Sequence, residues 1–253
     1  MVLVFGGTTE GKRTIKVLEQ RKMAFIYSTK TNVDVEESAF LNYRFGALDQ
    51  AAMNLQISEN NISMIIDAAH PFAEVLHQTV DLVAKENQIP VVRFGRKPID
   101  IKETKEVHWV DGYTQAQALL FDQFQGKKLL GLTGVQTINK FEKWWKKNPS
   151  VYRILPRETS INIAANAGYP NEQLILSMPN QDQTLEEQLI KDQSIEVIMT
   201  KESGASGFLQ TKIDAAQACN IPIIIIREPK IPASFQVVYT VQELEKILAQ
   251  YSF

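Results

Sequence analysis

The sequence predicts an α/β protein with parallel sheets. Short apolar runs alternate with amphipathic helical patterns along the 253 residues, and this alternation is typical of parallel strands that are joined by helices. A strand, a glycine turn and a helix open the chain, and a strand, a threonine-glycine turn and a helix recur from residue 127. Because the pattern restarts after Pro98, we expect two domains, over residues 1–98 and 99–253.

The composition is that of a globular protein. Apolar residues make up 44% of the chain, which is enough for a full core, and the net charge is −2. No apolar run is long enough for a membrane span, and the start of the chain shows no charged region or cleavage site of a signal peptide. The single cysteine has no disulfide partner. We therefore expect a cytoplasmic protein with no nucleic-acid or membrane partner and no metal site; the oligomeric state is unknown.

The first strand, residues 2–5, leads into the turn Gly-Gly-Thr-Thr at residues 6–9 and then into a helix over residues 10–20. Glycines at such a turn let backbone amides approach a phosphate, and Thr8 or Thr9 can cap the helix or donate a hydroxyl to the same anion. The glycine spacing departs from the full dinucleotide fingerprint. A plain strand-helix turn therefore remains an alternative.

The second strand, residues 23–27, is followed by Ser28 and Lys30 without an acidic residue. An acid at this strand end would bind the 2′-hydroxyl of NAD, whereas a base accommodates the 2′-phosphate of NADP. Lys30 thus favours NADPH, although a solvated surface lysine is an equal explanation. The sequence then predicts a turn with an arginine at residues 42–46 and a helix over residues 49–59.

The densest group of reactive side chains follows the apolar run at residues 65–67. Asp67 ends this strand, His70 and Phe72 lie in the loop, and a helix is predicted over residues 73–87. Ligands bind at the carboxyl ends of parallel strands, where helix N-termini and loop amides converge. Asp67 can instead cap the helix, and Phe72 can pack on the core.

The next strand opens with Pro90 and ends in three cations, Arg93, Arg96 and Lys97. These cations fit either a solvated rim or an anionic ligand.

The second half repeats the order of strand, turn and helix. We expect an irregular and mobile loop near residues 161–171 and another loop at residues 201–207. The expected strands are residues 108–110, 127–132, 151–155, 196–200 and 221–226, and the expected helices are residues 113–124, 137–147, 184–191, 209–219 and 241–249.

Several segments together resemble the precorrin-6A reductase family of cobalamin biosynthesis. They are GGTTEGKR, IIDAAHPFA, IPVVRFGRKP, LLGLTG and VIMTKESGASGFLQTKIDAAQACNIPIIIIREP, and they occur in the family order over nearly the whole chain. The resemblance implies two Rossmann-like domains, with a reduced dinucleotide and a corrin precursor bound in the cleft between them. It also implies reduction of a double bond of precorrin-6A or cobalt-precorrin-6A, by a hydride to ring carbon 19 and a proton to ring carbon 18.

Individual residues match the motifs of this family. The expected cofactor-binding residues are Gly6, Gly7, Thr8, Thr9, Glu10, Ser28, Lys30 and Gly46, and the cofactor is NADPH, with NADH possible. The expected substrate-binding residues are Asp67, Phe72, Arg93, Arg96, Lys201, Ser203, Gly204 and Lys212.

Three departures from the family pattern are visible. Thr29-Lys30-Thr31 replaces an alanine-glycine-arginine stretch, Ala69 replaces a threonine, and the glycine-rich segment after the third strand is reduced to Phe45-Gly46. The first departure weakens the NADPH preference, and the second excludes an essential hydroxyl at residue 69.

The chemistry of this substrate explains why such residues are suited to the site. A tetrapyrrole edged with acetates and propionates needs local cations from a protein of near-zero net charge. His70 is the expected proton donor because histidine titrates near neutral pH. A short-chain dehydrogenase is excluded because no tyrosine has a lysine four residues later. Methyl transfer is disfavoured by the lack of a separate glycine-rich methyl-donor motif, and a dinucleotide-binding sensor without enzymatic activity is the alternative.

Overall fold

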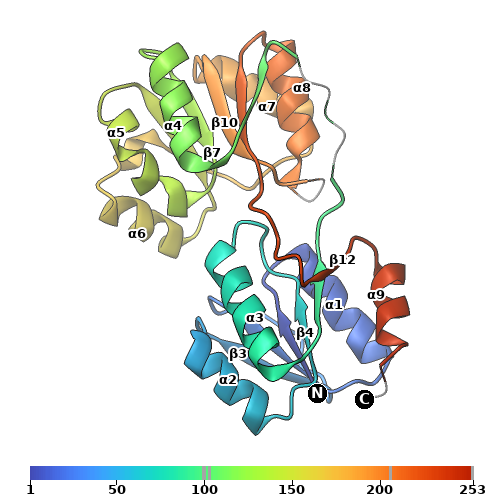
Figure 1. The fold of residues 1–253 in the computed structure, drawn as a ribbon. Coiled ribbons are helices and arrows are strands. Elements are labelled where there is room, and N and C mark those ends of the chain that lie inside the picture. The colour runs from blue at the N-terminus through green and yellow to red at the C-terminus, as the bar shows by residue number, and fades with distance from the viewer. Residues whose placement is uncertain (99–100, 102–103, 205–206, 252–253) are drawn as a thin grey trace. The chain divides into compact units, whose positions relative to one another are not determined.

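The computed structural model describes residues 1–98, 101, 104–204 and 207–251. The chain forms two compact units (Figure 1). The first unit consists of Met1–Lys97 together with Pro229–Phe253, and the second consists of Pro98–Glu228. No helix among the described residues is both long enough and apolar enough to cross a membrane.

The first unit contains a six-stranded sheet in which all strand pairs are parallel, in the order β12-β5-β4-β1-β2-β3. Because β1 lies between β2 and β4, the chain leaves β1 in one direction and returns to its other side, which makes β1 and β4 the topological switch point. The strands are β1 (Val2–Phe5), β2 (Phe25–Thr29), β3 (Leu41–Phe45), β4 (Met64–Asp67), β5 (Val91–Phe94) and β12 (Gln236–Val238). The helices are α1 (Thr9–Gln20), α2 (Gln50–Glu59), α3 (Glu74–Asn87) and α9 (Val241–Leu248).

The core of the first unit has two halves because successive strand residues point to opposite faces. On one face, Val2 and Val4 pack in one cluster with residues of α1 and α9. On the other face, Leu3 packs in a second cluster with residues of α2 and α3. The four inner strands β1, β2, β4 and β5 are buried on both faces, which explains why they are mostly apolar in the sequence.

The carboxy-terminal segment returns to the first unit, which corrects the expected second domain of residues 99–253. β12 pairs in parallel with β5, and α9 lies beside α1 (Figure 1). Phe235 is buried in the cluster that faces α2 and α3, and Ser234 hydrogen-bonds Asp81 of α3. The apolar pattern predicted α9 correctly but carried no information about which sheet the segment joins.

The second unit also has a six-stranded sheet with parallel pairs throughout, in the order β6-β11-β10-β7-β8-β9. Here the switch point lies between β7 and β10. The strands are β6 (Val107–Val110), β7 (Leu129–Leu132), β8 (Ser150–Ile154), β9 (Leu174–Leu176), β10 (Val197–Lys201) and β11 (Ile223–Ile226). The helices are α4 (Gly112–Gln123), α5 (Glu142–Trp145), α6 (Glu158–Asn166), α7 (Gln183–Asp192) and α8 (Leu209–Ala218).

Three local expectations were wrong. The predicted turn at residues 42–46 is mostly the edge strand β3, and the predicted irregular stretch at residues 161–171 largely continues α6. The predicted helix over residues 137–147 is broken into the 3₁₀ turns η1 (Val135–Thr137) and η2 (Asn139–Phe141) and the short α5. In this last segment Trp145 Nε1 donates to the Ile138 carbonyl at 2.9 Å, which takes that carbonyl away from a regular helical ladder.

Candidate functional site

Two loops meet at the switch point of the first sheet. Thr8 Oγ1 donates a hydrogen bond of 2.6 Å to the carbonyl of Ala68, which joins the loop after β1 to the loop after β4. The same hydroxyl accepts from the amide of Gly11 at 3.0 Å and so caps α1. The cap satisfies one of the first-turn amides of α1, and this helix N-terminus faces the position where a phosphate binds in Rossmann-like units.

Tyr27, a buried residue of β2, explains part of the glycine pattern. A Cβ on Gly6 would lie 2.2 Å from the Tyr27 ring, and one on Gly11 would lie 2.7 Å from its hydroxyl. The amide of Gly7 donates to that hydroxyl at 2.8 Å, and Gly7 has a φ of 89°. Gly6 and Gly11 are therefore required by packing, while Gly7 is exposed in a conformation that favours glycine.

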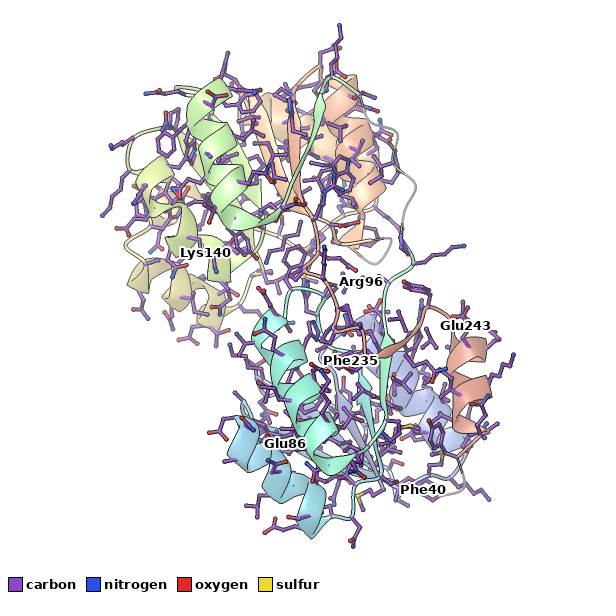
Figure 2. The ribbon with its side chains drawn as sticks, viewed as in Figure 1. Phe40, Glu86, Arg96, Lys140, Phe235 and Glu243 are labelled. Atoms are coloured by element: carbon purple, nitrogen blue, oxygen red, sulfur yellow. The ribbon has the colours of Figure 1, made fainter. Side chains whose placement is uncertain are left out.

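Glu10, an expected cofactor ligand, and Arg96, an expected substrate ligand, form an ion pair. Glu10 is buried in the first turn of α1, and Arg96 Nε lies 3.4 Å from Glu10 Oε2. Arg96 follows the end of β5 by two residues and is labelled in Figure 2. The pair places a guanidinium near the amino end of α1.

A buried ion network lies beneath the loop after β4. Asp67 is fully buried, its Oδ2 lies 2.6 Å from Nδ1 of His77 in α3, and its Oδ1 accepts from Arg93 of β5 at 2.9 Å. Arg93 also donates to the carbonyls of Asp67 at 3.2 Å and Ala69 at 3.0 Å. His77 Nε2 lies 3.1 Å from the Pro71 carbonyl. The network thus fixes the start of the loop, because Arg93 and His77 bond the backbone carbonyls of Asp67, Ala69 and Pro71.

The partners of Asp67 determine the charge of its carboxyl group. Burial alone would raise the pKa of Asp67, but the hydrogen bond from His77 and the charges of Arg93 and His77 outweigh burial and lower it. Each ring nitrogen of His77 faces an acceptor, Nδ1 the Asp67 carboxylate and Nε2 the Pro71 carbonyl. His77 was not identified from the sequence, where it is one polar residue among the apolar positions of a helix.

The network changes the interpretation of two expected substrate ligands. Arg93 is 2% exposed and Asp67 is not exposed at all, and each side chain is bonded to the other. The sequence suggested a solvated rim or a ligand contact for Arg93, and the structure instead places it inside the core. Both residues position the loop that carries His70 and Phe72.

His70 is exposed at the tip of this loop. Its Nδ1 accepts from the Phe72 amide at 3.2 Å, and the two rings lie 5.9 Å apart. With Nδ1 as an acceptor, the hydrogen of the neutral imidazole is on Nε2. The carbonyl of His70 accepts from the Ala73 amide at 2.8 Å, which fixes the turn before α3.

The ends of β2 and β3 bring together Ser28, Lys30, Gly46 and an arginine that the sequence analysis assigned no role. Arg44 donates from Nη1 to the buried Ser28 Oγ at 2.5 Å and from Nη2 to a backbone carbonyl at 3.2 Å. Lys30 is exposed, and the amide of Gly46 donates to Thr29 at 3.0 Å. Arg44 was missed because it fell in a predicted turn rather than at a strand end.

The remaining expected ligands lie after β10 in the second unit. Lys212 of α8 is buried and donates to the Gly207 carbonyl at 2.8 Å, with Thr200 Oγ1 at 3.5 Å. Ser203 Oγ also donates to Gly207, at 3.3 Å, and Gly204 is buried with a φ of 59°. Lys212, Ser203 and Gly204 therefore shape the loop through backbone contacts.

Lys201 ends β10 and differs from these three. Its Nζ lies 5.6 Å from the centroid of the Tyr113 ring. Burial and the nearby charge of Lys140 lower its pKa to about 8. The second unit thus contains a half-buried ammonium whose charge state changes close to neutral pH.

Comparisons with known proteins agree with this architecture. The family model described as precorrin-6x reductase CbiJ/CobK matches residues 1–251. A cobalt-precorrin-6A reductase of Synechocystis is 31% identical over 191 residues, which cover 75% of this chain and 72% of that protein. One of Methanocaldococcus jannaschii is 27% identical over 98% of both chains. The solved structure of CobK precorrin-6A reductase superposes with a TM-score of 0.80 at 21% identity, over 98% of this chain and 96% of that chain, and this likeness concerns the fold.

We predict that Asp67→Asn lowers the free energy of unfolding by about 3–5 kcal/mol, because it leaves Arg93 and His77 without their carboxylate. The pKa of Asp67 is lowered in the folded protein. Its contribution is therefore complete above the unfolded value of about 3.9 and is lost as the pH falls through the lower folded value. Urea unfolding at several pH values measures both effects. Asp122→Asn, at an exposed position of α4, is the control, and an equal change in the two variants would contradict the network.

We predict that Lys201 reacts with acetic anhydride at a lower pH than an ordinary lysine. Pulse labelling followed by mass spectrometry should give half-maximal reaction near pH 8, as burial and Lys140 lower its pKa to about 8. Lys140→Gln should move this midpoint upward, because it removes one of the two causes. Titration of Lys201 at the value of a lysine peptide, about 10.4, would exclude the half-buried environment.

Proposed function

The chain belongs to the precorrin-6x reductase family, and from that membership we propose that a bound nicotinamide dinucleotide reduces one carbon–carbon double bond of its corrin precursor. The protein is an oxidoreductase of cobalamin biosynthesis that acts on precorrin-6A or cobalt-precorrin-6A. We further propose the cofactor, the side chains that bind it and the proton donor.

The observation that carries the cofactor proposal is the hydrogen bond between Thr8 and Ala68 at the switch point. It brings the exposed Gly7, the amino end of the 12-residue α1 and the loop of His70 to one edge of the sheet. A pyrophosphate fits this edge because helix amides favour an anion and Gly7 presents no side chain. When bound, the nicotinamide supplies the hydride.

Arg44 supports NADPH over NADH. The ribose 2′ position lies beyond the end of the second strand in Rossmann-like units, where an acidic residue selects NAD. This chain has Ser28 there, hydrogen-bonded to Arg44, with the exposed Lys30 two residues further on. Two cations can neutralise a 2′-phosphate, and the guanidinium can donate two parallel hydrogen bonds to it.

Reduction of a carbon–carbon double bond also requires a proton, and we assign its delivery to His70. The neutral His70 accepts from the Phe72 amide through Nδ1. A second proton on Nδ1 displaces that amide and gives the imidazolium, which can deliver a proton from Nε2. The Asp67 network keeps the loop in place while His70 changes its charge.

The reaction itself is tested by anaerobic mixing of the protein with NADPH and precorrin-6A or its cobalt form. We predict that nicotinamide oxidation accompanies loss of macrocycle conjugation. His70→Ala should lower kcat by about 10²–10⁴-fold while dinucleotide affinity is kept, because only proton transfer is removed. Unchanged kcat in this variant would exclude His70 as the proton donor. Tight dinucleotide binding without reduction of either substrate would instead indicate a dinucleotide sensor.

We predict that Arg44→Ala weakens NADPH binding by about 10- to 100-fold and leaves NADH binding unchanged, because only NADPH carries the 2′-phosphate. Nicotinamide fluorescence gives both dissociation constants without turnover. The control is Arg21→Ala, at an exposed position after α1, and thermal unfolding checks that loss of the Ser28 hydrogen bond leaves the fold intact. Equal weakening of both cofactors would show that Arg44 does not recognise the 2′-phosphate.

A further inference from the structure

Three side chains gather at the carboxyl edge of the second sheet, around its switch point. Tyr113 is in the first turn of α4, directly after β6. Lys140 lies in η2, on the segment that follows β7, and is labelled in Figure 2. Lys201 is the last residue of β10. Parallel strands end at one edge, so three separate connections deliver these side chains to a common place where ligands bind in open α/β sheets.

The Tyr113 ring is the centre of this cluster. Lys140 Nζ lies 4.5 Å and Lys201 Nζ lies 5.6 Å from the ring centroid. The ring packs edge-on against the fully buried Phe141, with centroids 6.2 Å apart. A core residue thus fixes the aromatic surface that holds both ammonium groups.

Two ammonium groups beside one ring repel each other, and the charge of Lys140, after burial, contributes to the lowered pKa of Lys201. A carboxylate between them would remove this repulsion and accept a charge-assisted hydrogen bond from each. The neighbouring Glu202 uses Oε2 to accept from the amide of Glu228 at 2.9 Å. Lys212 is separated from the cluster, because it approaches Thr200, whose side chain points to the opposite face of β10 from that of Lys201.

We propose that Lys140 and Lys201, held by Tyr113, form a carboxylate-binding site that receives an acidic side chain of the tetrapyrrole. The flat ring of Tyr113 offers an apolar surface beside the two charges, which matches a ligand with a planar body and carboxylate arms. The identity of the ligand rests on the proposed function, whereas the preference for a carboxylate rests on the lysine pair. The sequence analysis included Lys201 among the substrate ligands but neither Lys140 nor Tyr113.

The test is equilibrium binding of uroporphyrin, a tetrapyrrole with acetate and propionate arms, to the full chain without nicotinamide cofactor. Porphyrin fluorescence gives the dissociation constant. We expect Lys140→Ala and Lys201→Ala each to weaken binding about tenfold, and Lys140→Arg to retain it. The matched control is Lys143→Ala, which removes an exposed lysine of α5 three residues away. Thermal unfolding verifies that each variant is folded.

Two outcomes would overturn the proposal. One is equal affinity of Lys140→Ala and Lys143→Ala, and the other is no binding of uroporphyrin by the unmodified protein. Steady-state reduction separates this inference from the proposed function. Lysine-dependent binding without reduction of precorrin-6A would contradict the function alone, whereas normal reduction with an unchanged KM in Lys140→Ala would contradict the lysine site alone.

Discussion

The loop that carries His70 depends on one buried carboxylate. Asp67 balances the guanidinium of Arg93 and hydrogen-bonds the ring of His77, and these three residues come from β4, β5 and α3. Removal of the carboxylate would leave buried positive charge, which is much more costly than loss of an exposed ion pair. The Thr8–Ala68 hydrogen bond connects the same loop to the amino end of α1. A core interaction therefore determines the shape of the surface that we propose as the dinucleotide site of the first unit.

The elements that sequence predicted well are those whose signal is local. β1, β4 and β11 are continuous apolar runs, and their burial on both faces of a parallel sheet is the direct cause of that pattern. β3 and β12 were missed because edge strands carry exposed polar residues and resemble turns. The return of β12 to the first sheet was unpredictable for a further reason. Its partner β5 is far away in the chain, and no local pattern encodes that pairing.

The structure joins the two loops that the sequence indicated as a candidate site, but it gives several of their residues contacts that the sequence did not predict. The glycine turn and the loop after Asp67 were found because strand ends with reactive side chains mark ligand sites in α/β folds. The sequence grouped Arg93 with the cations that follow it and predicted a solvated rim or a ligand contact. Its side chain is instead buried in the core. His77 and Arg44 acquire their roles only through contacts with residues distant in sequence, namely Asp67 and Ser28. Such contacts have no signature in a single sequence.

The two sheets present different chemistry at their carboxyl edges. The first presents helix amides, hydroxyls and Arg44, which suits a dinucleotide, and the second presents the ammonium groups of Lys140 and Lys201, which suit carboxylates. We propose that the dinucleotide binds to the first sheet. An amide NMR titration with NADP⁺ tests it most directly. We predict that shift changes concentrate at residues 6–9, 28–30 and 44–46. Changes concentrated at residues 133–136 of the second unit would contradict it.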